Sequence, residues 1–175
     1  MQMQAQWQKS KEQVDRRHEQ ACREILGRHL IRPPVDDEED RKRATDFLTN
    51  PSGMVVLPAD QRIAWRVRSY KTYEKYSTDF TIRTSNRGKG KLTELDKILA
   101  GCADFYLYCF EGACCESIHY YYVLDMQVFR AWYATECRRT GRKPGTRMPV
   151  NDGEMTVFKI RKVGPGFVLA EGYGK

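Results

Sequence analysis

Arg62-Ile-Ala-Trp-Arg-Val-Arg68 is the stretch that decides the fold, because its apolar and polar residues alternate with a period of two. Such alternation is typical of a β-strand whose two faces meet different surroundings. The odd-numbered residues Ile63, Trp65 and Val67 point to one side, and the arginines at even positions point to the other. We therefore expect one sheet face with fixed cations, and this face is the first candidate for function.

A second stretch, Asp79-Phe-Thr-Ile-Arg-Thr-Ser85, repeats this pattern and predicts another half-buried strand. Its polar side begins with the carboxylate of Asp79. An apolar run at residues 54–57 precedes the arginine strand, and residues 70–76 link that strand to the second one. We therefore expect residues 44–85 to form a three-stranded antiparallel meander in which Asp79 lies beside the arginines.

The bulk composition indicates a single folded domain. The chain has 175 residues, of which 41% are hydrophobic and 30% charged, so it has enough apolar surface for a core and is not typical of disordered chains. No apolar run reaches the roughly 18 residues that span a bilayer, and the N-terminus does not resemble a signal peptide. We expect a cytoplasmic protein without a membrane partner. Its net charge of +7 favours a polyanionic partner, although a merely basic protein explains the charge equally well.

The cysteines and histidines do not predict a metal or nucleophile site. None of the six cysteines forms a Cys-x-x-Cys pair, and the three histidines are scattered. A structural zinc site needs paired ligands at short spacing. We expect reduced thiols, as in the cytosol, with Cys109 in the core.

The remaining pattern completes an α+β fold with a central mixed sheet, an N-terminal helix and flanking helices. A helix is expected from residue 3 to about residue 30, ended by Gly27 and Pro33, and a second one from Leu92 to Gly101. Strands are expected at 104–110 and 118–124, followed by a helix that Asp125 caps. A C-terminal β-hairpin is expected from residues 156–162 and 167–170. The single domain 1–175 thus divides into the helix (1–34), a core (44–135) and a basic tail with the hairpin (138–175).

This order of elements (α, β, β, β, α, β) is similar to the core of the PD-(D/E)xK, or restriction-endonuclease-like, superfamily. The resemblance covers residues 5 to about 135. It implies a first catalytic acid at Asp46 and an acid-x-Lys element near residues 64–68, where this chain has Ala64-Trp-Arg-Val-Arg68. The acid is missing there, and Arg68 or Arg66 replaces the lysine.

Five short segments also resemble small phage and prophage proteins without assigned function, which implies a phage-associated chain in the host cytosol. The segments are Ala44-Thr-Asp46, Ala64-Trp-Arg-Val-Arg68, Asp79-Phe-Thr-Ile-Arg83, Thr93-Glu94 and Ala103-Asp-Phe-Tyr-Leu-Tyr108.

The candidate catalytic residues are Asp46, Asp79, Glu94 and Arg68, with Asp46 and Asp79 as the metal ligands. Carboxylates that converge within a few ångströms hold Mg²⁺ in phosphodiesterases, so Mg²⁺ is the cofactor if the chain is catalytic. The alternative is that Asp46 and Asp79 pair with Arg66, Arg68 and Arg83 in a cross-strand ion network. We favour the network or a binding role, because an arginine stays charged and does not act as a base near neutral pH.

Basic residues outside this group are candidates for binding nucleic acid. The residues are Arg66, Arg83, Arg87, Lys89, Lys91, Lys97, Arg138 and Arg139. Three of them lie in the loop 86–91, and Arg138 and Arg139 begin a second cluster with Arg142, Lys143 and Arg147. Cations on loops bind phosphates without reading sequence, but both groups are also compatible with ordinary solvated surface.

Tyrosines at positions 106, 108, 120 and 122 alternate on two predicted strands. They either stack on bases or a protein partner, or pack under a helix with their hydroxyls at the rim.

Three functions remain open. The first is a nuclease-like protein that binds nucleic acid, or a complex that handles it, with little or no catalysis. The second is an active Mg²⁺-dependent DNA endonuclease. The third is a phage-encoded inhibitor that binds a host defence or transcription protein. The oligomeric state is left open.

Overall fold

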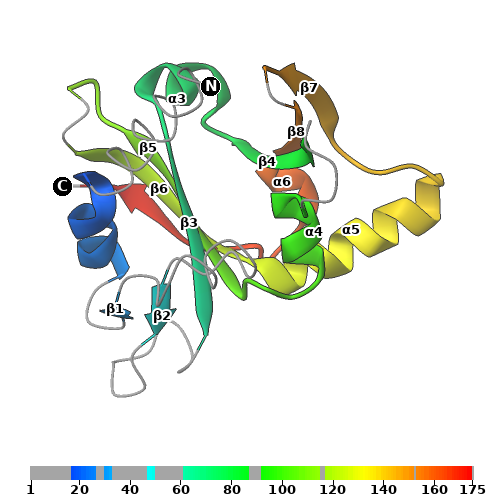
Figure 1. The fold of residues 1–175 in the computed structure, drawn as a ribbon, viewed down its shortest axis with the longest axis horizontal. Helices are drawn as coiled ribbons and strands as arrows, with labels where there is room; N and C mark the ends of the chain where they lie inside the picture. Colours follow the sequence, from blue (N-terminus) through cyan, green and yellow to red (C-terminus); the bar gives the residue numbers. More distant parts are fainter. Residues whose placement is uncertain are drawn as a thin grey trace.

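The computed structural model describes residues 17–26, 61–86, 92–114, 117–151 and 153–174, and the backbone of 30–32 and 47–49. These residues form two sheets with helices beside them (Figure 1). The larger sheet has the strand order β1-β2-β3-β5-β6-β9, and the smaller one has the order β4-β8-β7. The strands are β1 (Leu30–Arg32), β2 (Phe47–Thr49), β3 (Arg62–Arg68), β4 (Asp79–Asn86), β5 (Phe105–Glu111), β6 (Ile118–Asp125), β7 (Thr146–Val150), β8 (Gly153–Lys159) and β9 (Val168–Tyr173). The helices are residues 17–26, α3 (Tyr70–Tyr76), α4 (Glu94–Leu99), α5 (Met126–Thr140) and α6 (Ile160–Val163).

The α+β class and the mixed sheet are confirmed by the pairing of β3. This strand runs antiparallel to β2 and parallel to β5. A parallel pair needs a long crossover connection, and here the crossover contains α3, β4 and α4. Strand β3 therefore lies inside the larger sheet, between β2 and β5, and is the long central strand in Figure 1.

The alternation of β3 is confirmed, since its two sides enter two different cores. Ile63 packs with Cys22 and Leu26 of the N-terminal helix, and Trp65 and Val67 lie against the same cluster. The even-numbered side, beginning with Ala64, belongs to the core between the two sheets.

Strand β4 does not lie beside β3, so the predicted meander 44–85 is wrong in its last strand. Strand β4 pairs with β8 in the smaller sheet. The reason is local: residues 70–76, expected as a link, form α3 instead and carry the chain out of the plane of the larger sheet. An antiparallel meander does form, but its strands are β1, β2 and β3. The expected strand at 54–57 lies outside the described residues.

The predicted C-terminal hairpin is also wrong, because β8 and β9 belong to different sheets. The apolar residues Ile160 and Val163 form the short helix α6 and are buried, which turns the chain away from β8. Strand β9 then pairs with β6. The hairpin in this part of the chain is β7–β8.

Helix boundaries follow their capping signals. Asp125 accepts bonds from the N–H groups of Gln127 and Val128 and so begins α5, as predicted. Gly141, with φ of 66°, ends it in the left-handed region. Thr93 and Asp96 form a capping box at α4. The N-terminal helix ends sooner than predicted, because Leu30 lies in β1. No described helix is long and apolar enough to cross a bilayer.

Aromatic side chains fill the core between the two sheets. Phe80 of β4 is fully buried and contacts the rings of Tyr106 and Tyr108 at centroid distances of 5.2 and 5.3 Å. Tyr106, Tyr108 and Tyr122 are each less than 7% exposed. The expected packing of these three tyrosines in the core is therefore confirmed, but Tyr106 and Tyr108 pack against Phe80 of the smaller sheet rather than under a helix.

Candidate functional site

A buried polar layer lies between the two sheets, at the level of Arg66. Its guanidinium contacts the carboxylate of Glu94 in α4, with 2.9 Å between Arg66 Nη2 and Glu94 Oε2. The same oxygen accepts the backbone N–H of Arg83 at 3.0 Å, and the other oxygen accepts the hydroxyl of Tyr106. The side chains of Arg66 and Glu94 are 24% and 12% exposed. An ion pair therefore does form on the arginine face of β3, but its acid is Glu94 of α4, whereas the network hypothesis proposed Asp46 and Asp79.

Arg68 lies two residues further along β3 and is held by neutral groups. Its Nε donates to the hydroxyl of Tyr108 at 3.2 Å, and its Nη2 donates to the carbonyl of Thr81 at 3.0 Å and to the Thr81 hydroxyl. The hydroxyls of Thr81 and Tyr108 are also bonded to each other, at 2.8 Å. Within the described part of the chain, Arg68 forms no ion pair.

The contacts around Glu94 decide its protonation. Burial on its own raises the pKa of Glu94, but Arg66, Tyr106, the N–H of Arg83 and Arg68 outweigh it and hold the pKa below the ordinary 4.5. Burial opposes the charge of Arg66 as well, yet Glu94 and Tyr106 raise the net pKa of that guanidinium. Burial and the carboxylate raise the pKa of the Tyr106 hydroxyl well above 10.0. At neutral pH the layer thus holds an ionised pair and a tyrosine that donates.

The lowered pKa of Glu94 predicts an acid-sensitive step in stability. A carboxyl whose pKa is lower in the folded state stabilises that state above its unfolded pKa, and this contribution is lost as the pH falls through the folded pKa. We expect the free energy of unfolding, measured by urea titration at several pH values from 7 downward, to decrease below about pH 4.5. A Glu94→Gln variant should decrease less steeply over this range. If the free energy of unfolding fell equally steeply with pH in the two proteins, Glu94 would not be the source of the acid sensitivity.

Asp79 does not join Glu94 in the polar layer. Its carboxylate is 2% exposed and accepts two bonds from Lys159 of β8, at 2.7 and 2.9 Å, and one from the hydroxyl of Thr78 at 3.4 Å. The expected pairing of Asp79 with arginines is therefore wrong, because β4 pairs with β8 and places Asp79 opposite Lys159. Among the residues whose positions are described, no three His, Cys, Asp or Glu side chains are placed to hold a metal ion.

Several other predicted residues are outside or apart from this layer. Asp46, Arg87, Lys89 and Lys91 lie outside the described residues. Lys97 is in the last turn of α4. Arg83 reaches Glu94 through its backbone N–H. The catalytic role of Asp46, Asp79, Glu94 and Arg68 stays a prediction.

The exposed cations gather instead on residues 138–147, which we call the basic segment. It contains five lysines and arginines and no acid: Arg138, Arg139, Arg142, Lys143 and Arg147. All five are exposed, and they follow one another from the last turn of α5 through the turn into β7. Arg139 is paired with Glu136 at 2.7 Å, whereas Arg138, Arg142 and Lys143 form no ion pair with a described residue. Cations without acidic partners are available to a polyanion.

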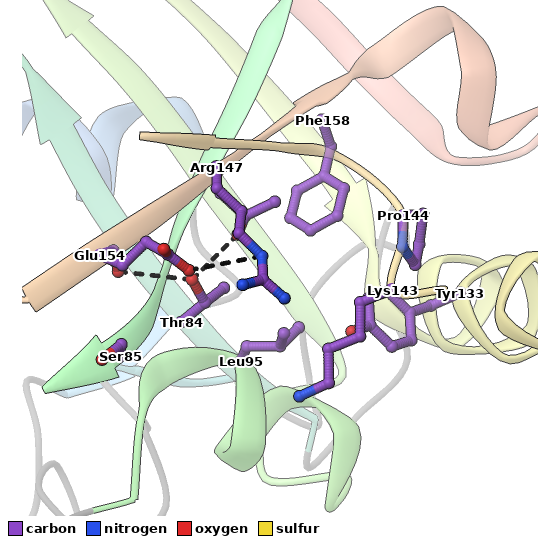
Figure 2. Close-up of a pocket in the computed structure, with 10 residues that line it drawn as sticks. Thr84, Ser85, Leu95, Tyr133, Lys143, Pro144, Arg147, Glu154 and Phe158 are labelled. Atoms are coloured by element: carbon purple, nitrogen blue, oxygen red, sulfur yellow. Dashed lines mark hydrogen bonds and ion pairs between the residues drawn. The ribbon is translucent and has the colours of Figure 1, made fainter. Parts of the chain in front are cut away.

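A pocket of about 300 Å³ lies under the basic segment (Figure 2). Its lining is Thr84, Ser85, Leu95, Tyr133, Lys143, Pro144, Arg147, Glu154, Thr156 and Phe158. Lys143 and Arg147 approach it from the segment, and the hydroxyls of Thr84 and Thr156 are bonded to each other at 2.9 Å on its wall. Arg147 Nε lies 3.7 Å from Glu154 Oε1, and the two side chains are 67% and 32% exposed, so this pair is weak. The pocket thus joins two cations and the carboxylate of Glu154 to a wall of hydroxyl groups.

Sequence reasoning named this segment as a basic cluster but missed the pocket beneath it. Thr84 and Thr156 are 72 residues apart and meet only through the β4–β8 pairing. The partner of Asp79 was missed for the same reason. The alternating pattern of β8 was the available signal, but it does not tell which strand β8 joins.

Comparisons of this chain with protein-family models, with curated proteins and with solved structures gave no match.

Proposed function

We propose that this protein binds the phosphate backbone of nucleic acid through the basic segment 138–147, and that it has little or no nuclease activity. The observation that carries the proposal is the run of five exposed cations, three of them without an ion pair to a described residue, above a pocket lined by Lys143, Arg147 and hydroxyl groups together with Glu154. Lysine and arginine side chains supply the electrostatic, sequence-independent part of nucleic-acid binding. The formal charge of +7 for the whole chain acts in the same direction.

The arginine face of β3 is a poor candidate for this binding. In the layer between the sheets, Arg66 forms an ion pair with Glu94. Arg68 donates hydrogen bonds to Tyr108 and Thr81. The active-endonuclease alternative gains no support from the described carboxylates, because Asp79 is held by Lys159 and Glu94 by Arg66. No described contact favours the host-protein inhibitor over nucleic-acid binding.

The order of the elements supports a PD-(D/E)xK-like core within this proposal. A helix is followed by the antiparallel meander β1-β2-β3, by a crossover that contains α4, and by β5 parallel to β3. The letters of this order are those of the resemblance, α, β, β, β, α, β, but its three strands are β1, β2 and β3, whereas the sequence suggested residues 54–57, β3 and β4; α3 and β4 stand in the crossover. The phage association and the cytosolic location belong to the same proposal.

The salt dependence of binding tests the role of the basic segment. We expect the triple variant Arg138→Gln/Arg142→Gln/Lys143→Gln to bind duplex and single-stranded DNA more weakly than the unchanged protein. The slope of log K against log[salt] should become less negative by about 1 for each phosphate that the variant no longer neutralises, up to about 3. Fluorescence anisotropy from 25 to 300 mM salt measures both quantities.

A charge-matched triple variant on other elements is the control: Lys71→Gln/Lys75→Gln/Arg161→Gln removes three exposed cations from α3 and α6. It should keep most of the affinity and slope. Equal losses in the two triple variants would show a general charge effect. Absence of binding at the lowest salt would reject the proposal.

A further inference from the structure

We propose that a hollow beside Arg68 binds a small carboxylate with a short apolar chain. The hollow has a volume of about 130 Å³ and lies between α3 and the smaller sheet; we call it the Arg68 pocket. Its lining is Arg68, Thr72, Tyr76, Thr81, Met148, Met155 and Val157. It shares no lining residue with the pocket under the basic segment. The inference is therefore independent of nucleic-acid binding.

The polar layer has an excess of positive charge beside the Arg68 pocket, which favours a bound anion there. The layer contains the two guanidinium groups of Arg66 and Arg68 but the single carboxylate of Glu94, which contacts Arg66. In the described part of the chain, no carboxylate lies within ion-pair distance of Arg68. Glu94 also acts on Arg68 electrostatically, but one carboxylate does not balance two partly buried guanidinium groups, so an anion bound in the hollow would stabilise the arrangement.

The guanidinium of Arg68 is also fixed in position to receive a carboxylate. Tyr108 and Thr81 hold its Nε and Nη2 nitrogens. Arginine has five N–H donors, and no described residue accepts from Nη1. A guanidinium that presents its N–H groups in a fixed plane matches the two oxygens of a carboxylate.

The other residues that line the Arg68 pocket favour a ligand with an apolar chain attached to its carboxyl group. Met148, Met155, Val157 and the ring of Tyr76 are apolar, and methionines adapt their shape to small groups. A volume of 130 Å³ corresponds to only about four water molecules, at about 30 Å³ each. A nucleotide is too large, and inorganic phosphate has nothing to place against the apolar wall. A carboxylate with two or three carbons beyond the carboxyl group fits both the guanidinium of Arg68 and the apolar wall.

Titration of the full-length protein with acetate, propionate, butyrate and hexanoate at constant ionic strength tests the inference. Protein-observed NMR detects the weak affinities expected of such small ligands. We expect saturable binding that tightens from acetate to butyrate and stops improving at hexanoate. Butyramide and inorganic phosphate should bind at least tenfold more weakly than butyrate. Equal or tighter binding of phosphate, or the absence of saturation with any acid, would overturn the proposal.

Variants separate this pocket from other basic surface. Arg68→Gln should weaken butyrate binding at least tenfold. Met148→Glu adds a negative charge at the mouth of the pocket, at a side chain that is 37% exposed, and should do the same without disturbing the polar layer. The exposed control Arg161→Gln should bind butyrate like the unchanged protein. If Arg68→Gln does not fold, Met148→Glu decides. Unchanged affinity in Met148→Glu, or in folded Arg68→Gln, would show that the ligand binds elsewhere.

Discussion

Replacing Glu94 by glutamine should cost about 3 to 5 kcal/mol of the free energy of unfolding at pH 7. The variant keeps the size of the side chain but leaves the guanidinium of Arg66 without its counter-ion between the two sheets. Removing one partner of a buried ion pair costs this much because the remaining charge is still desolvated. The three groups that bond to Glu94 come from β3, β4 and β5, so the loss should affect both sheets.

Urea denaturation followed by circular dichroism measures this effect. The control is Glu136→Gln, whose ion pair with Arg139 lies on the surface, and it should change stability by less than about 1 kcal/mol. The double variant Arg66→Met/Glu94→Leu should recover much of the loss, because an apolar pair needs no counter-ion. If Glu94→Gln costs no more than Glu136→Gln, the layer is hydrated and does not hold the sheets.

Phe80→Ala should destabilise the protein by about 3 to 5 kcal/mol, through the cavity it leaves. Phe80 is fully buried, and its ring lies within 6.5 Å of those of Tyr106, Tyr108, Phe129, Phe158 and Phe167, measured between centroids. These rings belong to β5, α5, β8 and the segment before β9. No small movement of one element is therefore expected to close the cavity.

Thermal and urea unfolding measure the loss, and two variants calibrate it. Phe80→Leu keeps much of the volume and should cost clearly less than Phe80→Ala. Leu169→Ala removes a side chain that is already 41% exposed and should cost less than about 1 kcal/mol. A similar loss in Phe80→Ala and Leu169→Ala would mean that the core between the sheets is not closely packed.

Local sequence patterns predicted where the strands and helices of this chain lie, but they did not predict which strands pair with one another. The alternation of residues 62–68 identified β3 and the side of the sheet that its arginines occupy. The cap at Asp125 identified the start of α5. These signals depend on neighbours in the sequence. The pairings β4–β8 and β6–β9 join segments distant in sequence, and a pattern with a period of two is the same whichever strand lies alongside.

The candidate site also has one part that the sequence alone predicts and one part that depends on the fold. The cations of residues 138–147 could be recognised from composition, because exposed charge needs no partner. The ion pair of Arg66 could not, since the position of Glu94 depends on the crossover that carries α4 over the sheet. The predicted meander placed Asp79 beside the arginines, whereas the fold places Lys159 beside it.

After β8 the chain leaves the smaller sheet, and its last strand, β9, joins the larger one. Both sheets are therefore completed only by strands near the C-terminal end of this sequence. Strand β4 finds its sheet partner in β8, and the outer edge of β6 is covered by β9. Until residues 153–173 have left the ribosomal exit tunnel, a nascent chain therefore carries β4 without a described partner strand and β6 with one edge open. Open strand edges are where chains aggregate. Folding of this domain thus finishes after translation of its last strands, and truncation before β8 should yield a protein that aggregates rather than a shorter folded domain.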